Sequence, residues 1–490
     1  MRQAVLIMTD TQRTDMLGCY GGPLSTPELD SLAASGVRFS RAYTAQPVCG
    51  PARAALFTGY YPHSAGSWSN SMPLGQHAAT IGERLERTGL HTAYIGKWHL
   101  DGFDYFGRGS APPGWDPAYW YDMRNYLEEL APADRLRSRC TTTNREHIDA
   151  ELTYAHRVTE RAIRFIRRHR NEDFLLVVSY DEPHHPHLCP EPYAGMYRDF
   201  RFPKRNNVWD TLSGKPEHQI LWAGEAVASD RDAVEIRNDD FFGCNSFVDS
   251  EIGRVVSEID ASAPDAMVVY TADHGDMLGS HCLSGKGPAA YDEIARVPFI
   301  VRGPDVPEGE VSSGLVSHVD IVPTLLTFFR EPVPRMLEGR PLQPQLAAPA
   351  QSVNDRVFLE FGRYEIDHDG FGGFQPMRAV VRGRYKLVLN LTSSDELYDL
   401  VADPDEMVNL VTYEDYGQIR DELHDMLLEW MNETRDPFRG YQWMTRPWRV
   451  TDGAQLWDVS GMTRQRDDED LPRQLDYETG LEMEEPTRPK

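Results

Sequence analysis

Reactive side chains follow four short apolar runs of this sequence, each with the composition of a buried strand. In open α/β sheets, ligands bind beyond the carboxyl ends of the strands, so side chains that follow such runs meet at one edge of the sheet. A single aspartate at such a place is often only a turn or a helix cap. Four reactive endings together indicate a catalytic or binding site. They are Asp10, then Lys97 and His99, then His184, and finally Asp273 and His274.

Three of these side chains could hold a metal ion. Asp10 and Asp273 offer carboxylate oxygens, and His274 offers an imidazole nitrogen. This donor set favours a hard cation such as Ca²⁺ or Mg²⁺, because Zn²⁺ usually takes more nitrogen or sulfur. Each residue alone also fits a structural role, Asp10 as a cap and the other two as a turn. Together they predict one divalent cation, with Ca²⁺ as the first choice and Mg²⁺ or Mn²⁺ as alternatives.

The segment that begins at Cys49 has the features of a helix start. Pro51 suits the first turn and Gly59 suits the end, so Cys49 and Arg53 lie at the amino terminus of this helix. Free backbone amides and the helix dipole favour an anion there. On its own, Cys49 fits a buried thiol equally well. With Lys286 and the lysine and histidines named above, an oxyanion site is the better interpretation.

The elements that would position these residues alternate between strands and helices. Runs rich in β-branched and aromatic residues alternate with amphipathic helices, which predicts an α/β fold with a large, mostly parallel sheet sandwiched by helices. The expected helices include one capped by Thr26 with Pro27 at its first position, one at 152–170 and one at 323–329. The expected strands cover 4–8, 92–95, 174–180, 267–270 and 297–301.

The character of the chain changes after about residue 350. Short runs at 357–361, 377–381 and 385–390 predict a small antiparallel sheet with a turn at Gly383, and a helix at about 419–433 packs on it. Beyond residue 451 the chain is polar and acidic, as in an extended tail. We therefore expect a catalytic α/β domain at 1–350, a C-terminal α+β subdomain at 351–450 and an acidic tail at 451–490.

Net charge and cysteine use argue against several kinds of partner and linkage. A formal net charge of -26 over 490 residues repels nucleic acid and anionic membranes, so neither is expected as a partner. An anionic substrate would need a local basic pocket. The sequence has no apolar stretch of membrane-helix length and no recognisable secretion signal, which predicts a cytoplasmic protein. Six scattered cysteines predict reduced thiols and no structural disulfide.

Several motifs along the chain match the pattern of one enzyme family. The run Cys49-Gly50-Pro51-Ala52-Arg53, with Leu56-Phe57-Thr58-Gly59, resembles the signature of the formylglycine-dependent sulfatases, whose fold belongs to the alkaline phosphatase superfamily. The resemblance covers most of the chain, in the same order and spacing. It includes Gly96-Lys97-Trp98-His99, Pro183-His184-His185-Pro186, Asp273-His274-Gly275, Gly285-Lys286-Gly287, Asp320 with Pro323-Thr324-Leu325-Leu326, and Glu396-Leu397-Tyr398-Asp399-Leu400.

The resemblance implies a role for each matching residue. Cys49 would be oxidised to formylglycine by a formylglycine-generating enzyme, and the hydrate would attack sulfur while its oxygens bind the metal. Arg53 and Lys97 would hold the hydrate, and Lys286 would bind the sulfate oxygens. One imidazole would protonate the leaving alcohol and the other would take the second hydrate proton, as general acid-base catalysis requires. The resemblance suggests His184 for the first step and His99 for the second, and it implies Asp10, Cys49, Asp273 and His274 as metal ligands.

One position departs from the family pattern. The family has two adjacent aspartates after the first strand, whereas Thr11 follows Asp10 here. A hydroxyl or a water would fill that coordination position, and the lost negative charge leaves the identity of the metal open. A related branch that hydrolyses phosphonate or phosphate esters departs at the same position. A phosphonate or phosphodiester hydrolase is therefore the alternative function. A catalytically silent binding homologue is a third, disfavoured because Cys49, Arg53 and the lysines are present.

The resemblance also indicates a class of substrate. The stretch 377–391, and Trp430 with the segment 433–437, are similar to saccharide sulfatases, including the N-sulfoglucosamine type. This similarity implies a small anionic sulfated saccharide. The sugar, the sulfate position and the oligomeric state stay open. Aromatic residues between Phe103 and Tyr126 either stack on sugar rings or pack under their own loop, and the candidates are Trp115, Tyr119 and Trp120.

Overall fold

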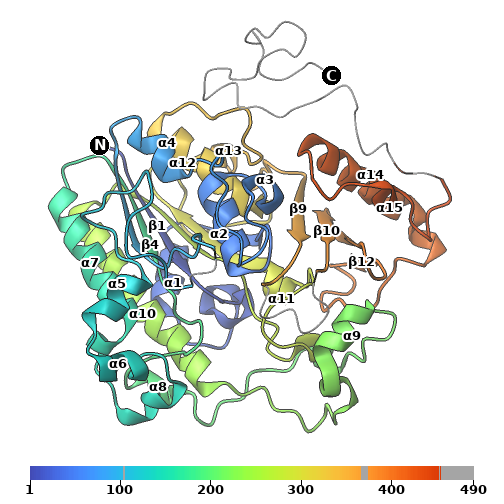
Figure 1. The fold of residues 1–490 in the computed structure, drawn as a ribbon, viewed down its shortest axis with the longest axis horizontal. Helices are drawn as coiled ribbons and strands as arrows, with labels where there is room; N and C mark the ends of the chain where they lie inside the picture. Colours follow the sequence, from blue (N-terminus) through green and yellow to red (C-terminus); the bar gives the residue numbers. More distant parts are fainter. Residues whose placement is uncertain (103–104, 366–373, 452, 454–490) are drawn as a thin grey trace, which may run out of the picture.

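Two β-sheets with their helices make up the part of the chain that the structure describes. A computed structural model describes residues 1–102, 105–365, 374–451 and 453. An eight-stranded sheet lies between two layers of helices, and a four-stranded antiparallel sheet with its own helix lies beside it (Figure 1). This arrangement confirms the expected fold class. Residues 452 and 454–490, which include most of the expected acidic tail, lie outside the described residues.

Four adjacent parallel strands form the part of the large sheet that matters for the site. In spatial order they are β3 (His91–Gly96), β4 (Phe174–Ser179), β1 (Gln3–Thr9) and β5 (Met267–Ala272). Nearly every residue of these strands is buried, as expected for strands that are covered on both faces. Because the four strands run in the same direction, their carboxyl ends meet at one edge.

The sheet continues with strands of mixed direction. Strand β6 (Arg296–Arg302) is antiparallel to β5 and to β2 (Val37–Tyr43). Two short strands, β7 (Glu310–Ser312) and β8 (Val316–Ser317), pair with β2 in parallel. Strands β2, β7 and β8 were not predicted from the sequence. The arginines and serine within β2 interrupt its apolar character, and several of its residues are only half-buried.

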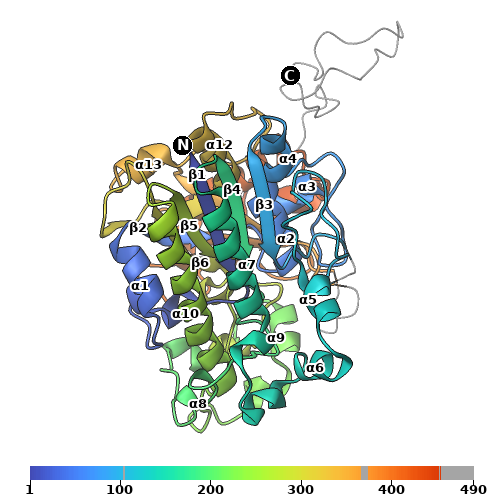
Figure 2. The ribbon, with the colours of Figure 1, turned by 90° about the vertical axis from the view of Figure 1, so that its left-hand side faces the viewer.

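Helices cover both faces of the large sheet. On one face lie α1 (Pro27–Ala34), α7 (Tyr154–His169) and α10 (Asp239–Ser262), and the last two lie in front of the strands in Figure 2. On the other lie α2 (Cys49–Thr58), α4 (Ile81–Glu86), α12 (Ile321–Phe329) and α13 (Gln343–Ala347). Strand β1 serves both cores, since Val5 and Ile7 pack on the first side and Leu6 and Met8 on the second.

Short helices lie in the connections between these elements. They are α3 (Pro62–Ala65), α5 (Met123–Glu129), α6 (Pro132–Arg137), α8 (Tyr193–Met196), α9 (Glu217–Ala223), α11 (Asp292–Ala295) and α15 (Tyr441–Met444).

None of the helices among the described residues is long and apolar enough to cross a membrane. All six cysteines are free thiols.

The predicted cap of α1 is only partly right. Thr26 does occupy the cap position, but its hydroxyl accepts no hydrogen bond from a backbone amide of the helix. It accepts one from the backbone nitrogen of Gly18, at 2.9 Å, and donates to Asp30 Oδ1, at 3.4 Å. The carboxylate of Asp249, from α10, accepts hydrogen bonds from the backbone of Glu28 and Leu29 at 3.1 and 2.9 Å. A distant side chain thus satisfies the free amides of the first turn.

The small sheet has the order β12-β11-β10-β9. Its strands are β9 (Arg356–Phe361), β10 (Met377–Arg382), β11 (Tyr385–Asn390) and β12 (Glu396–Asp399), and α14 (Gly417–Glu433) packs on it. Gly383, with φ +56°, makes the predicted turn between β10 and β11. The buried guanidinium of Arg378 binds Asp436, at 3.0 Å from Nη2 to Oδ1, and ties the segment after α14 to the sheet. Strand β12 was not predicted.

Candidate active site

The ends of the four parallel strands form the floor of the candidate site. Asp10 follows β1, Lys97 follows β3, Asp181 comes two residues after β4, and Asp273 follows β5. All four side chains are buried. The sheet therefore brings together residues from distant parts of the sequence, as the strand endings predicted.

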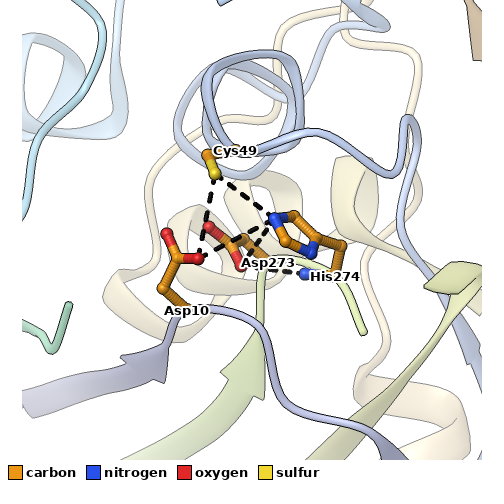
Figure 3. A group of neighbouring side chains, drawn as sticks. All are labelled: Asp10, Cys49, Asp273 and His274. Atoms are coloured by element: carbon orange, nitrogen blue, oxygen red, sulfur yellow. Dashed lines mark hydrogen bonds and ion pairs between the residues drawn. The ribbon is translucent and has the colours of Figure 1, made fainter. Parts of the chain in front are cut away.

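Four side chains meet closely enough to share one cation. They are Asp10, Cys49, Asp273 and His274, all buried, with one potential ligand atom each within 4.8 Å of all the others. Figure 3 shows Cys49 reaching down from the start of α2 towards the two carboxylates and the imidazole. The sulfur of Cys49 lies 3.3 Å from His274 Nε2 and 3.8 Å from Asp10 Oδ1.

The orientation of His274 fits metal binding. Its Nδ1 donates a hydrogen bond to the backbone carbonyl of Gly275, at 2.8 Å, so the neutral ring carries its proton there and Nε2 presents a lone pair. Metal-bound histidines are commonly fixed in this way by a carbonyl on the other ring nitrogen. Two carboxylates and one imidazole are also suitable donors for a hard divalent cation. The residues present therefore fit the cation that the sequence predicts.

Thr11 supports the two carboxylates by hydrogen bonds. Its hydroxyl donates to Asp10 Oδ1 at 2.7 Å, and its backbone nitrogen donates to Asp273 Oδ1 at 3.1 Å. The backbone of Thr11 has a positive φ of 61°, which is uncommon for a β-branched residue. The position where the family has a second aspartate is thus occupied by a residue that orients the carboxylates.

Three cationic side chains surround this group. Arg53 lies between Asp10 and Asp273, at 3.3 and 3.1 Å, and also donates to the carbonyl of Lys97. The ammonium of Lys97 contacts Asp10 at 2.7 Å and Asp181 at 2.8 Å. The ammonium of Lys286 lies 2.6 Å from the sulfur of Cys49 and 2.9 Å from His274 Nε2. Three buried cations are therefore concentrated at one place in an acidic protein.

Burial and charge set the protonation of the ionisable groups. Burial and the carboxylate of Asp10 together raise the pKa of the Cys49 thiol to about 12, against the opposing effect of Lys286. Burial and the neighbouring Asp10 raise the pKa of Asp273 to about 7. Burial acts in the same direction on Asp10, but Lys97 and the other cations outweigh it and hold that pKa well below its usual range. The two carboxylates therefore repel each other, and a cation between them would relieve that repulsion.

The two predicted acid-base histidines lie beside the cationic groups. His184 is half-buried, and its Nδ1 lies 3.0 Å from the carbonyl of His185 and 3.1 Å from the hydroxyl of Tyr105. Burial and Lys97 lower its pKa to about 3. His99 is buried with φ +56°, and its Nδ1 has no hydrogen-bond partner among the described residues. Burial and Lys97 also lower the pKa of His99, so both imidazoles are neutral.

Tyr105 and Asp181 belong to the site but were not predicted. The hydroxyl of Tyr105 accepts from Lys97 Nζ at 2.9 Å and donates to Asp181 at 2.6 Å, beside His184. Its ring centroid lies 5.0 Å from that of His99. Asp181 carries the same signal as Asp10, a carboxylate directly after an apolar run, and could have been found. Tyr105 lies in a loop without any regular pattern.

Trp115 and Trp120 are not placed to stack on a sugar ring, which was one of the two possibilities for these aromatic residues. Both side chains are buried, with 2% and 8% of their surface exposed. They pack with Tyr94 at centroid distances of 5.2 and 5.3 Å, and both also contact Trp98. Tyr119 contacts His91 and His169 at the opposite end of β3. These aromatic side chains pack under their own loop, which was the other possibility.

Comparison with known proteins identifies the family. A family model described as Sulfatase matches residues 2–330, and one described as N-sulphoglucosamine sulphohydrolase, C-terminal, matches residues 280–433. An uncharacterized sulfatase, YidJ, of Escherichia coli strain K12 is 45% identical over 486 residues, covering 97% of this chain and 96% of the relative. An N-acetylglucosamine-6-O-sulfatase of Bacteroides thetaiotaomicron is 25% identical, covering 88% and 86%.

Solved structures share the fold. One is of a protein in complex with its substrate D-glucosamine-2-N,6-O-disulfate, with a TM-score of 0.72, 22% identity, and coverage of 89% of this chain and 98% of that chain. Another is a phosphonate monoester hydrolase of Agrobacterium radiobacter, with a TM-score of 0.70, 24% identity, and coverage of 87% and 95%. The fold is that of the alkaline phosphatase superfamily. Within it, the chain belongs to the sulfatase family and is a sulfuric ester hydrolase.

Proposed function

We propose that this enzyme removes sulfate from a small sulfated saccharide, with Cys49 matured to formylglycine and one divalent cation bound beside it. The observation that carries the proposal is the environment of the Cys49 sulfur. The sulfur is buried beside the carboxylates of Asp10 and Asp273 and the unprotonated Nε2 of His274. The ammonium of Lys286 lies 2.6 Å from it. A structural thiol does not require such a concentration of charged groups, whereas an anionic ester at a metal centre does.

The unmodified thiol is poorly suited to attack an ester. With a pKa raised to about 12 by burial and by Asp10, only a trace of thiolate exists at neutral pH. The hydrate of formylglycine at this position, formed by addition of water to the aldehyde, would supply a hydroxyl nucleophile and oxygen donors for the cation. A formylglycine-generating enzyme is then the necessary maturation partner.

The three cations would stabilise the negative charge that develops on the reacting group. Lys286 lies closest to residue 49 and is placed to bind the sulfate oxygens. Arg53 and Lys97 hold Asp10 and Asp273 in place through buried ion pairs and offset their charge. Fixed cations in a buried site are effective because they need no reorganisation during the reaction.

The two histidines would move protons. The neutral His99, with a free Nδ1, is able to accept a proton from the nucleophile. His184 must first gain a proton before it can give one to the leaving alcohol, because Lys97 and burial keep its pKa near 3. The negative charge of a bound sulfate ester would oppose the effect of Lys97 and raise that pKa. His184 would thus become an acid only when substrate is bound.

Calcium is the cation that we propose for the site. Oxygen donors from two carboxylates and from residue 49 outnumber the one imidazole nitrogen, and such sets favour a hard cation. The hydroxyl of Thr11 is engaged with Asp10 and contributes no charge. This site should therefore bind Ca²⁺ more weakly than a site with three carboxylates would.

A sulfated saccharide is the proposed substrate class. Two observations support it: the match of residues 280–433 to the N-sulphoglucosamine sulphohydrolase C-terminal model, and the likeness to an N-acetylglucosamine-6-O-sulfatase. Turnover of a panel of sulfated mono- and disaccharides, with an aryl sulfate and matching phosphate esters alongside, tests this directly. We expect the highest kcat/KM on a sulfated sugar.

A phosphonate or phosphodiester hydrolase is the second candidate. Thr11 at the variable metal position and the fold shared with a phosphonate monoester hydrolase favour it. The same panel decides between the two, because a higher kcat/KM on phosphate esters than on every sulfate ester would overturn the first proposal.

A further inference from the structure

A second cluster of metal-binding side chains lies far from the candidate active site. His91 is the first residue of β3, His169 is the last residue of α7, and Glu172 lies in the turn that leads into β4. One potential ligand atom of each lies within 4.8 Å of the other two. The two imidazole rings meet edge to face with centroids 4.3 Å apart. Three separate elements thus converge on one point.

The hydrogen bonds of His91 leave a lone pair facing a carboxylate. Its Nε2 lies 2.8 Å from Asp116 Oδ2, while the other oxygen of Asp116 accepts from the backbone of Ala118. Since a carboxylate only accepts, the proton of a neutral His91 is on Nε2, and Nδ1 is bare. That bare nitrogen lies 3.6 Å from Glu172 Oε2. A cation bound between this nitrogen and the carboxylate would satisfy both of them.

His169 also directs its Nδ1 towards this oxygen of Glu172. Its Nδ1 lies 2.8 Å from Glu172 Oε2, and its Nε2 lies 2.7 Å from the hydroxyl of Tyr119. Each imidazole therefore directs Nδ1 towards Glu172 and is fixed at Nε2 by an outer partner, Asp116 or Tyr119. Outer partners of this kind orient the histidines of metal sites.

We propose that His91, His169 and Glu172 bind a borderline divalent transition metal, for which Zn²⁺ is the probe. Two nitrogens and one carboxylate oxygen, with a position open to water, form a donor set that Zn²⁺ prefers and Ca²⁺ does not. The rings of Phe165 and Tyr119 pack against His169, with centroids 4.5 and 5.1 Å away, and limit its motion. The side chain of Glu172 is 55% exposed, so it can adjust and the ion can enter from solvent.

The proposed ion would strengthen the fold without taking part in the chemistry. Lys97 lies six residues beyond His91 along β3, about 20 Å at the usual rise of a strand. The ion would cross-link the end of α7, the start of edge strand β3 and the entry to β4. An ion that binds only the folded state raises its stability. This role does not depend on the proposed function.

Calorimetric titration of ZnCl₂ into the Ca²⁺-saturated protein tests the proposal. We expect the wild type to bind one equivalent of Zn²⁺ at this cluster. Glu172→Gln and His91→Gln should each lower the affinity for that ion by at least about tenfold. Matched controls are Glu86→Gln, an exposed carboxylate without this cluster, and His147→Gln, an exposed histidine. Zinc bound elsewhere, for instance at exposed Cys140, would persist in all variants. Zinc should also raise the melting temperature of the wild type but not of Glu172→Gln.

Equal zinc binding by the wild type and by both cluster variants would overturn the proposal, as would absence of zinc binding by the wild type. Cys49→Ala should keep the zinc equivalent, because Cys49 is not part of the cluster. Zinc binding and turnover of sulfate esters are therefore independent readouts. A protein without turnover that still binds zinc at the cluster contradicts only the proposed function, and an active protein that binds no zinc there contradicts only the metal proposal.

Discussion

Arg53 is the residue on which the charge balance of the active site depends most. It is fully buried, and its guanidinium contacts both Asp10 and Asp273. Burial opposes its positive charge, but the two aspartates outweigh burial and raise its pKa above the usual range. Without Arg53, two carboxylates would remain buried with less compensation. Removal of one partner from a buried ion pair costs far more than the pair contributes on its own.

We therefore predict that Arg53→Met destabilises the metal-free protein by about 3–5 kcal/mol. Saturating Ca²⁺ should restore part of the loss, because a cation at Asp10 and Asp273 replaces some of the missing charge. Chemical denaturation with and without Ca²⁺ measures both effects. The control is Arg137→Met, a surface arginine paired with Asp134 and Glu146, whose loss should destabilise the protein far less because ion pairs in contact with solvent contribute little. Equal losses for the two variants would contradict the account.

Glu182 provides a prediction for pH. Burial and the adjacent Asp181 raise its pKa from 4.5 to about 8, while the backbone nitrogen of Ala155 donates to one oxygen at 2.9 Å. Between those pH values the folded protein keeps a proton that the unfolded chain releases. Stability should therefore fall as pH rises through this window, by up to about 1.4 kcal/mol per pH unit for one proton.

Glu182→Gln should remove this contribution, because the amide keeps the hydrogen bond from Ala155 and does not titrate. Free energies of unfolding of both proteins at pH 5 and pH 8 give the comparison. The wild type should lose stability relative to the variant at pH 8. Parallel profiles for the two proteins would show that Glu182 is charged in the folded state.

Among the elements, the end of β3 is the most constrained. Gly96 has φ +127°, and a Cβ atom there would lie 1.9 Å from the carbonyl oxygen of Ser179 on β4. The next residue is Lys97, whose backbone nitrogen bonds that same oxygen at 2.8 Å. Only glycine permits this close approach of two strands. The sequence at position 96 thus fixes where the ammonium of Lys97 enters the site.

Gly96→Ala should therefore lower both stability and kcat. Gly89→Ala is the matched control, because Gly89 also has a positive φ, +81°, but has open space around its Cα. Gly89→Ala should lower the free energy of unfolding by about 1–2 kcal/mol through backbone strain alone and leave kcat unchanged. Melting temperatures and initial rates of both variants measure the difference. If the two substitutions behave alike, close packing at Gly96 has no role in placing Lys97.

The strands that carry the site could be predicted because they are short, apolar and followed by reactive residues. Asp10, Lys97 and Asp273 follow such strands, and parallel pairing brings them together. Strand β2 could not be recognised, since half-buried polar residues hide its pattern. Tyr105 joins Lys97 to Asp181 through a loop, and the cap of α1 comes from Asp249 on another helix. Contacts of these two kinds depend on tertiary structure and leave no local pattern.

For the whole molecule, charge opposes the approach of the proposed substrate. The net charge is -26, whereas two of the three cations of the site, Arg53 and Lys97, are paired with buried aspartates. At low salt the long-range field of the protein should repel a polyanionic saccharide, and salt screens that field. The local contacts that bind sulfate are buried and much less affected.

Raising ionic strength from about 0.01 to 0.15 M should therefore increase kcat/KM on a sulfated oligosaccharide, by up to the order of tenfold. A monosulfated aryl ester carries less charge and should respond less. Initial rates at several salt concentrations provide the measurement. A fall in kcat/KM with salt would mean that a cationic surface around the site guides the substrate.

The central claim concerns the chemical state and the role of Cys49. Mass spectrometry of the peptide that contains Cys49, from protein produced together with a formylglycine-generating enzyme, measures the fraction converted to the aldehyde. Turnover of sulfate esters by the same preparations should rise in proportion to that fraction and be lost in Cys49→Ala. Full activity of Cys49→Ala, or of preparations in which Cys49 is entirely unmodified, would contradict the account.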